Sequence, residues 1–133
     1  MTEKNSIRVR DLMVEELHTI DGLATVADAM ALMKRHRVSS LVVTPRNSDD
    51  ELGLVVVADI ARGVIADNRA PERVNVYEIM SKPLLTLPED MLVKYAVRLL
   101  ARFGLSRAVV VDHDRKAIGI VTLRDLIMGY ATD

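Results

Sequence analysis

Val9-Arg-Asp-Leu-Met13 is the stretch that decides the fold, because Val76-Tyr-Glu-Ile-Met80 repeats it 67 residues later. The same offset relates three further pairs: Thr19-Ile20 with Thr86-Leu87, Ala29 with Ala96, and Val42-Val43 with Val109-Val110. Farther on, Gly53-Leu-Val55 corresponds to Gly119-Ile-Val121 with an offset of 66, as expected if a loop has lost one residue. These matches indicate an internal duplication. We therefore expect two repeats, residues 7–66 and 74–131, joined by a polar connector at 67–73.

The spacing of apolar residues predicts a helix early in each repeat. Val26, Met30 and Met33 are spaced i, i+4 and i+7, so they would share one face of a helix. Thr25, with Asp28 three residues later, is typical of a helix N-terminus, where the hydroxyl accepts a backbone N–H bond. The second repeat has the same signals, with a glycine suited to a helix C-terminus, at Val93, Val97, Leu100 and Gly104.

Two apolar runs follow each of these helices, with a polar turn between them. In the first repeat the runs cover residues 40–44 and 52–57, and in the second they cover 108–111 and 117–121. A closing helix is expected to start near Asp59 in the first repeat and near Asp125 in the second. A unit of about 60 residues would be marginally stable alone. We therefore expect a mixed α/β (α+β) fold in which tandem β-α-β-β-α repeats pack with pseudo-twofold symmetry.

Composition excludes several classes of protein. The 133 residues carry 18 Lys and Arg against 19 Asp and Glu, and only four aromatic side chains of Phe and Tyr. A nucleic-acid-binding protein needs a basic face, often with aromatics, so we expect no DNA partner. Without cysteine, disulfides and thiolate zinc sites are excluded. The longest apolar stretch, 52–58, is too short to span a membrane, and no signal peptide is visible, so we expect a cytoplasmic protein with no membrane partner.

The sequence offers no set of residues for chemistry. His18, His36 and His113 show no His-x-x-x-His or similar spacing, so we expect no metal site. No glycine-rich phosphate loop is present, which excludes a P-loop nucleotidase. No nucleophile stands beside a base, so we expect no catalytic residue and no enzyme activity.

The duplicated order of elements, with Gly119-Ile-Val-Thr-Leu-Arg-Asp125 at the last strand–helix junction, resembles a cystathionine-β-synthase (CBS) domain pair, or Bateman module. The resemblance runs from Val9 to Ala131 and implies a small stand-alone regulatory protein. It further implies an adenosine-containing ligand, which is AMP, ADP, ATP, NAD or S-adenosylmethionine, bound in a cleft between the repeats. Such a nucleotide would be a regulatory ligand and not a catalytic cofactor, and its binding would be signalled by a change of conformation or assembly to an unknown regulated protein.

The resemblance implies two clefts, each built from both repeats. The better site would contain Thr19, Ile20, Val38, Ser39, Ser40, Thr122, Arg124 and Asp125. The weaker site would contain Asp59, Thr86, Leu87, Leu105, Ser106 and Arg107. The second cleft departs from the family pattern, because Val56 replaces the expected hydroxyl residue and Ala58 replaces a polar one. We therefore expect one good adenosine site and one weak or empty site.

Physical chemistry supports these roles, and it also allows simpler ones. A carboxylate can accept hydrogen bonds from both ribose hydroxyls, and an arginine can bind phosphate. Equally, Thr122 and Asp125 form a capping-box pattern, and Asp59 could simply complement the helix dipole. Ser39 and Ser106 could bond nearby backbone. If these simpler roles hold, the pair would be a dimerisation or interaction scaffold without a ligand.

We also expect a homodimer. The closing helices carry more apolar residues than one small sheet needs to cover: Ile60, Val64, Ile65, Leu126, Ile127 and Tyr130.

Overall fold

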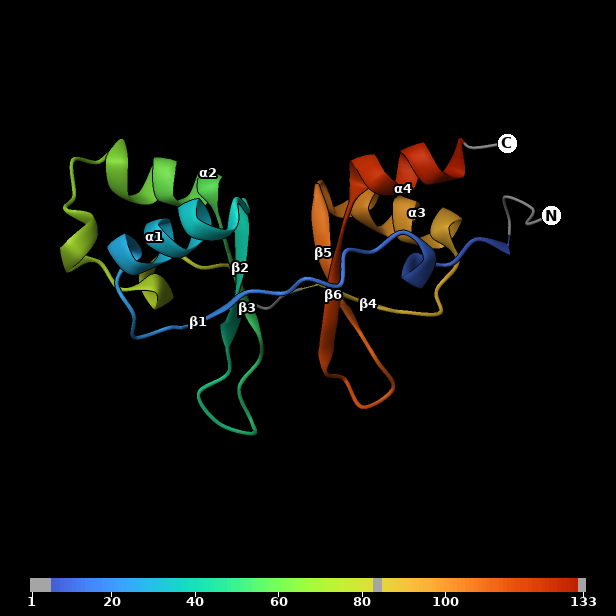
Figure 1. Cartoon of the computed structure of the whole chain (residues 1–133), viewed down its shortest axis with the longest axis horizontal. Helices are drawn as coiled ribbons and strands as arrows, with labels where there is room; N and C mark the ends of the chain where they lie inside the picture. Colours follow the sequence, from blue (N-terminus) through green and yellow to red (C-terminus); the bar gives the residue numbers. More distant parts are fainter. Residues whose placement is uncertain (1–5, 83–84, 132–133) are drawn as a thin grey trace. The chain divides into compact units, whose positions relative to one another are not determined.

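The computed structural model describes residues 6–82 and 85–131 and divides into two compact units (Figure 1). Among the described residues, the first unit comprises 18–82, and the second comprises 6–17 with 85–131. Within the described part of the chain, no helix has the length and apolar character needed to cross a membrane.

The first unit is a three-stranded sheet with helices. Its elements are β1 (Thr19–Asp21), α1 (Val26–His36), β2 (Ser40–Thr44), β3 (Gly53–Val56), α2 (Val57–Ile60), which continues as a π-helical segment (Ala61–Ile65), and two short 3-10 helices (Pro71–Arg73 and Val76–Glu78). The strand order is β1-β2-β3, with β1 parallel and β3 antiparallel to β2. The buried face of α1 packs with these strands in one apolar core.

The second unit repeats this plan. Its elements are a 3-10 helix (Val9–Asp11), β4 (Thr86–Pro88), α3 (Val93–Phe103), β5 (Arg107–Val111), β6 (Ala117–Thr122) and α4 (Leu123–Tyr130). The strand order is β4-β5-β6, again with one parallel and one antiparallel pair. The mixed α/β fold predicted from the duplication is therefore confirmed.

The helix signals in the sequence act as predicted, with one exception. The Thr25 hydroxyl accepts the N–H of Asp28, whose carboxylate accepts the N–H of Thr25, both at 3.1 Å. Gly104 ends α3 with φ of 65°, the left-handed conformation that favours glycine. The exception is Met30, which was expected to share the buried face of α1 but is 39% exposed, because the face that meets the sheet is centred on Ala29.

The boundaries of the compact units differ from those of the sequence repeats. The segment at the start of each repeat, 7–17 in the first and 74–82 in the second, lies in the compact unit formed mainly by the other repeat. Val9 belongs to the core of the second unit, whereas Val76, its counterpart in the repeat, belongs to the core of the first unit. Backbone bonds secure one of these segments to β6, since Val14 and Ile120 exchange N–H···O bonds of 2.8 and 2.9 Å. Each repeat therefore contributes its first segment to the compact unit that holds the other repeat's strands and helices.

Two glycines make room for these segments. A Cβ atom on Gly119 would lie 2.9 Å from the Sδ atom of Met13 and 2.9 Å from the carbonyl oxygen of Val14. On Gly53 it would lie 2.8 Å from Sδ of Met80, the residue that corresponds to Met13. Gly119 thus has a packing role, because a side chain there would meet the backbone of the segment that crosses the sheet, whereas at Gly53 it would meet the side chain of Met80.

We expect Gly119→Ala to destabilise the chain by about 1–3 kcal/mol, the usual effect of overpacking. The carbonyl of Val14 cannot move away without breaking its bond to Ile120. Urea unfolding measures the effect, with Gly22→Ala as the matched control. A Cβ on Gly22 would have its nearest neighbours at 3.5 Å, an ordinary contact, so that variant should stay within about 1 kcal/mol of wild type. Equal destabilisation by the two variants would contradict this role of Gly119.

An ion pair secures the β2–β3 hairpin to the end of the first unit. Lys82 Nζ lies 2.6 Å from Asp50 Oδ1, and the backbone N–H of Arg46 donates to Asp50 Oδ2 at 2.7 Å. The hydrogen bond from Lys82, followed by that from Arg46, lowers the pKa of Asp50 to about 2. A carboxyl whose pKa is lower in the folded state stabilises the fold above its unfolded pKa, and loses that contribution as pH falls through the folded value.

Asp50→Asn is therefore expected to flatten the dependence of unfolding free energy on pH between about pH 4 and pH 2. Urea midpoints measured across this range for wild type and variant give the difference directly. Asp49→Asn, at the exposed neighbouring position, should follow the wild-type curve. If Asp50→Asn loses stability on acidification as steeply as wild type does, the Lys82 ion pair has no such role.

Candidate functional site

Each of the two expected sites takes residues from both compact units. In the first unit lie one half of the better site (Thr19, Ile20, Val38, Ser39, Ser40) and Asp59 of the weaker one. In the second unit lie the other half of the better site (Thr122, Arg124, Asp125) and the remainder of the weaker one (Thr86, Leu87, Leu105, Ser106, Arg107).

In the first unit, the sheet brings the end of β3 beside the start of β2. Ser40 pairs with Val56, and the N–H of Val57 donates to the carbonyl oxygen of Ser39 at 3.0 Å. Thr19 is exposed, whereas the side chain of Ile20 lies in the core. A ligand that contacts β1 at Ile20 would therefore meet its backbone and not its side chain.

The carboxylate of Asp59 is already engaged within the first unit. Its Oδ2 accepts the N–H of Val56 at 2.9 Å, and its Oδ1 lies 3.5 Å from Arg62 NH2. The Asp59 carboxylate therefore caps the backbone at the start of α2.

The second unit has the same junction with different side chains. Arg107 pairs with Thr122 across β5 and β6, and the N–H of Leu123 donates to the carbonyl oxygen of Ser106 at 2.8 Å. Leu87 is fully buried in the core, as Ile20 is in the other unit. Thr86 is half-buried on β4, and Leu105 is exposed in the turn before β5.

Asp125 is the residue that sets this junction apart. The Thr122 hydroxyl accepts the N–H of Asp125 at 3.0 Å, so half of a capping box is present. The other half is a backbone N–H that donates to the carboxylate three residues later, and it is present at Asp28 and at Asp59. Within residues 6–82 and 85–131, the Asp125 carboxylate has neither a hydrogen bond nor an ion pair. A half-buried carboxylate at the start of a helix is thus left with its acceptor capacity open.

An open groove of about 600 Å³ lies along this junction, and two arginines line it. Its lining residues are Ser106, Arg107, Thr122, Leu123, Arg124, Ile127 and Met128. Asp125 is not among them, but it directly follows Arg124 on α4. The guanidinium groups offer planar sets of donors that suit phosphate oxygens.

The groove joins residues of the two expected sites. Ser106 and Arg107 belong to the expected weaker site, and Thr122 and Arg124 belong to the better one. The antiparallel register of the β5–β6 hairpin brings Arg107 opposite Thr122. The polar turn between the two predicted strands was a usable signal, because a short hairpin places the start of one strand beside the end of the next.

Comparison with known proteins decides the family. The sequence model of the CBS domain matches twice, at residues 9–66 and at 76–131. The chain belongs to the CBS domain family. Both matches end with the closing helices, so nearly all of the chain is a pair of CBS repeats.

Relatives of this CBS pair include proteins of several kinds. An uncharacterised protein of Methanopyrus kandleri, MK0525, is 30% identical over 92% of this chain, which spans 62% of that protein. The hexameric CBS-CP12 protein from bloom-forming cyanobacteria is 36% identical, with a TM-score of 0.86 over 91% of this chain and 66% of that one. The CBS domain of a bacterial CNNM/CorC family Mg²⁺ transporter, solved in complex with ATP, is 28% identical, with a TM-score of 0.79 over 96% of this chain and 89% of that one.

Proposed function

We propose that this CBS pair is a regulatory module that binds an adenosine-containing nucleotide between its repeats and signals by a change of conformation or assembly. The observation that carries the proposal is the open carboxylate of Asp125 beside Thr122 and Arg124. An acceptor-only group suits the two vicinal hydroxyls of ribose, which are both donors. The ATP complex of the related transporter domain supports the same class of ligand.

The other residues have roles that follow from their chemistry. Arg124 and Arg107 would bind phosphate, because both line the groove at the start of α4. The first unit would cover the purine with Val38 and with the backbone at Ile20, while Thr19, Ser39 and Ser40 would supply polar contacts. The ligand would then favour the arrangement of repeats that brings both halves together.

The second cleft would bind nucleotide weakly or not at all. Asp59 already accepts the N–H of Val56 and faces Arg62, so a ribose would have to compete for it. This cleft would be completed by Thr86, Leu87, Leu105 and Ser106. Arg107 would also belong to it, although the same residue lines the groove at the start of α4. AMP, ADP, ATP, NAD and S-adenosylmethionine remain the candidate ligands, and we propose that none serves a catalytic reaction in this chain.

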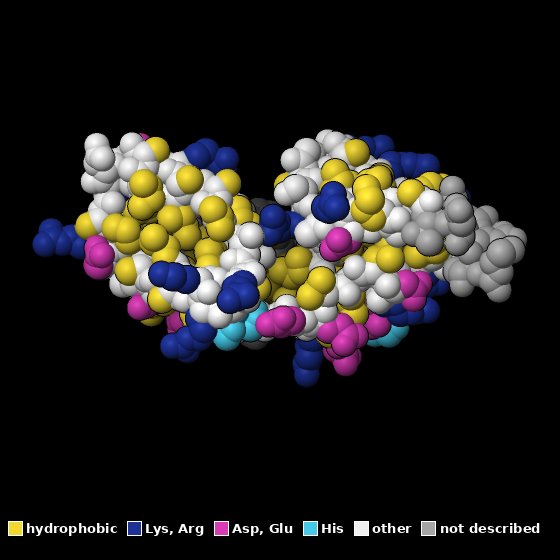
Figure 2. All heavy atoms as spheres, turned by 45° about the horizontal axis from the view of Figure 1, so that its top comes forward, with side chains coloured by type: hydrophobic (Ala, Val, Ile, Leu, Met, Phe, Trp, Pro, Cys, Tyr) yellow, Lys and Arg dark blue, Asp and Glu magenta, His cyan; other side chains and the backbone are white. Residues whose placement is uncertain are grey.

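We further propose that the module forms a homodimer through its helices. Of the six closing-helix residues expected to face a partner, Ile60, Val64 and Leu126 lie in the cores. The other three stay exposed, Ile65 at 51%, Ile127 at 40% and Tyr130 at 37%. Apolar side chains are visible on the helical face of each unit in Figure 2. Gel filtration at micromolar concentration is expected to give the mass of a dimer, and a monomer mass would contradict this proposal.

Thermal unfolding with and without nucleotide tests the sensor against the scaffold. A ligand at 100 times its dissociation constant adds about 2.7 kcal/mol to the unfolding free energy. For a chain of this length, that raises the Tm by about 10 °C. A scaffold without a ligand site would keep the same Tm in AMP, ATP, NAD and S-adenosylmethionine, and that result would refute the proposed function.

A further inference from the structure

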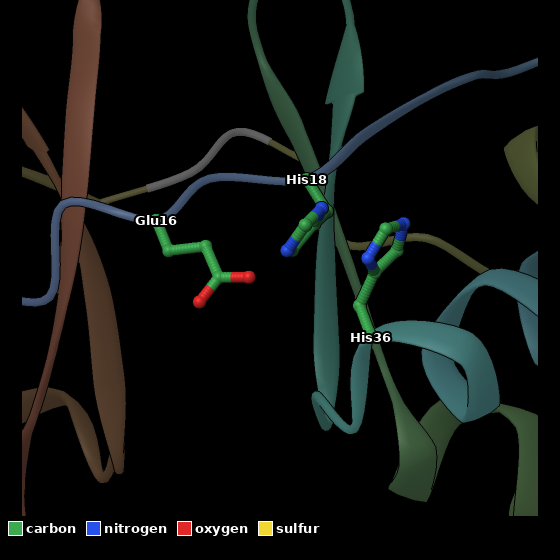
Figure 3. Close-up of side chains that lie close together, drawn as sticks. All are labelled: Glu16, His18 and His36. Carbon is green, nitrogen blue, oxygen red and sulfur yellow. The ribbon is translucent and has the colours of Figure 1, made fainter.

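Two histidines of the first unit stack on each other. His18 lies immediately before β1, and His36 is the last residue of α1 (Figure 3). Their ring centroids are 3.8 Å apart, with the ring planes inclined by 17°. A nitrogen of one ring lies within 4.8 Å of a nitrogen of the other. They lie 18 positions apart in the sequence, which is not a spacing that indicates a pair of metal ligands.

The fold secures the backbone on both sides of the pair. The carbonyl oxygen of His18 accepts the N–H of Val42 at 3.0 Å, which holds this residue at the edge of the β1–β2 ladder. Arg37 follows His36 with φ of 57° and ends α1, its N–H bonding the carbonyl of Met33. Both imidazoles are half-buried, so each is partly accessible from solvent.

We propose that His18 and His36 bind a divalent transition-metal ion, with Zn²⁺ as the probe. Imidazole nitrogen is a preferred ligand of zinc, copper and nickel ions. The carbonyl end of α1 carries a partial negative charge, which favours a cation beside His36. Lys34 and Arg35, also in the last turn, oppose the ion, but both are exposed and therefore screened.

Binding requires both rings to rotate out of the stacked arrangement. Zinc–nitrogen bonds are about 2.0–2.1 Å long, so a tetrahedral ion needs its two nitrogens about 3.3 Å apart. The rings must turn out of the stack until the lone pairs, which lie in the ring planes, converge. Water would fill the remaining positions.

Calorimetric titration of the full chain with zinc chloride tests this site. The protein is prepared without a polyhistidine tag, which would itself bind zinc. Nucleotide is left out, so the outcome is independent of the proposed function. Wild type is expected to bind one ion per chain, and His18→Asn or His36→Asn should each weaken binding at least tenfold. His113→Asn is the matched control, because His113 is exposed in the turn of the second unit. The site is wrong if wild type takes up no zinc, if it binds one ion per two chains, or if His113→Asn weakens binding as strongly.

A second measurement covers the case in which a histidine variant fails to fold. In wild-type protein labelled with ¹⁵N, zinc should shift the imidazole resonances of His18 and His36 and leave those of His113 in place. Unchanged resonances of His18 and His36 at saturating zinc would overturn the proposal, whatever the behaviour of the variants.

Discussion

Asp125→Ala is expected to abolish most of the rise in Tm that an adenosine nucleotide produces in the wild-type chain. The substitution removes the acceptor for two ribose hydroxyls, and a hydrogen bond to a charged group contributes about 1.5–3 kcal/mol. Losing one or both bonds weakens binding by about 10- to 100-fold or more. Without nucleotide, the variant should unfold close to the wild-type temperature, because the Asp125 carboxylate has no hydrogen bond or ion pair among the described residues.

Asp59→Ala is the matched control, since Asp59 occupies the same position of the other repeat. Its carboxylate accepts the N–H of Val56, so this variant should lose about 1 kcal/mol of stability as a capping residue does. It should nevertheless keep the full rise in Tm with nucleotide. The assignment of the two clefts would be reversed if Asp59→Ala lost the nucleotide response while Asp125→Ala kept it.

Leu126→Ala is expected to have the largest effect on stability, about 2–5 kcal/mol in the free energy of unfolding. Leu126 is fully buried and packs in the core of the second unit, so its removal leaves a cavity beneath α4. Urea unfolding measures the loss. Asp125 directly precedes Leu126 on α4. If the cavity lets α4 shift, Asp125 shifts with it, and the variant should then also bind nucleotide less tightly.

Ile127→Ala is the natural comparison, because the next side chain along α4 is 40% exposed. At a protein concentration that keeps the chain monomeric, we expect it to change the unfolding free energy by less than about 1 kcal/mol. Equal destabilisation by the two variants would mean that α4 packs differently from the arrangement described above.

Most of the fold could be predicted from the sequence, because the duplication doubles every local signal. The helix N-terminus at Thr25 and the C-terminus at Gly104 depend on residues close in sequence, and both form as expected. The exchange of first segments could not be predicted. Val9 and Val76 occupy equivalent positions in the two repeats, and nothing local says which sheet each one joins.

The candidate site could be predicted in its residue types but not in its hydrogen bonding. The sequence shows a threonine three residues before Asp125 and a valine three residues before Asp59. On that ground alone, Asp125 looks the better capping residue, yet in the structure Asp59 makes the backbone bond and the Asp125 carboxylate does not. Which carboxylate stays open depends on side-chain rotation at the helix start, and residue spacing does not report it.

Isothermal titration of the wild-type chain with AMP, ADP, ATP, NAD and S-adenosylmethionine tests the central claim most directly. We predict saturable binding of at least one of them, at one molecule per chain, with a dissociation constant below about 1 mM. If none of these ligands gives heat beyond dilution at millimolar concentration, the chain is not a sensor of adenosine-containing ligands, and the open carboxylate of Asp125 has another role.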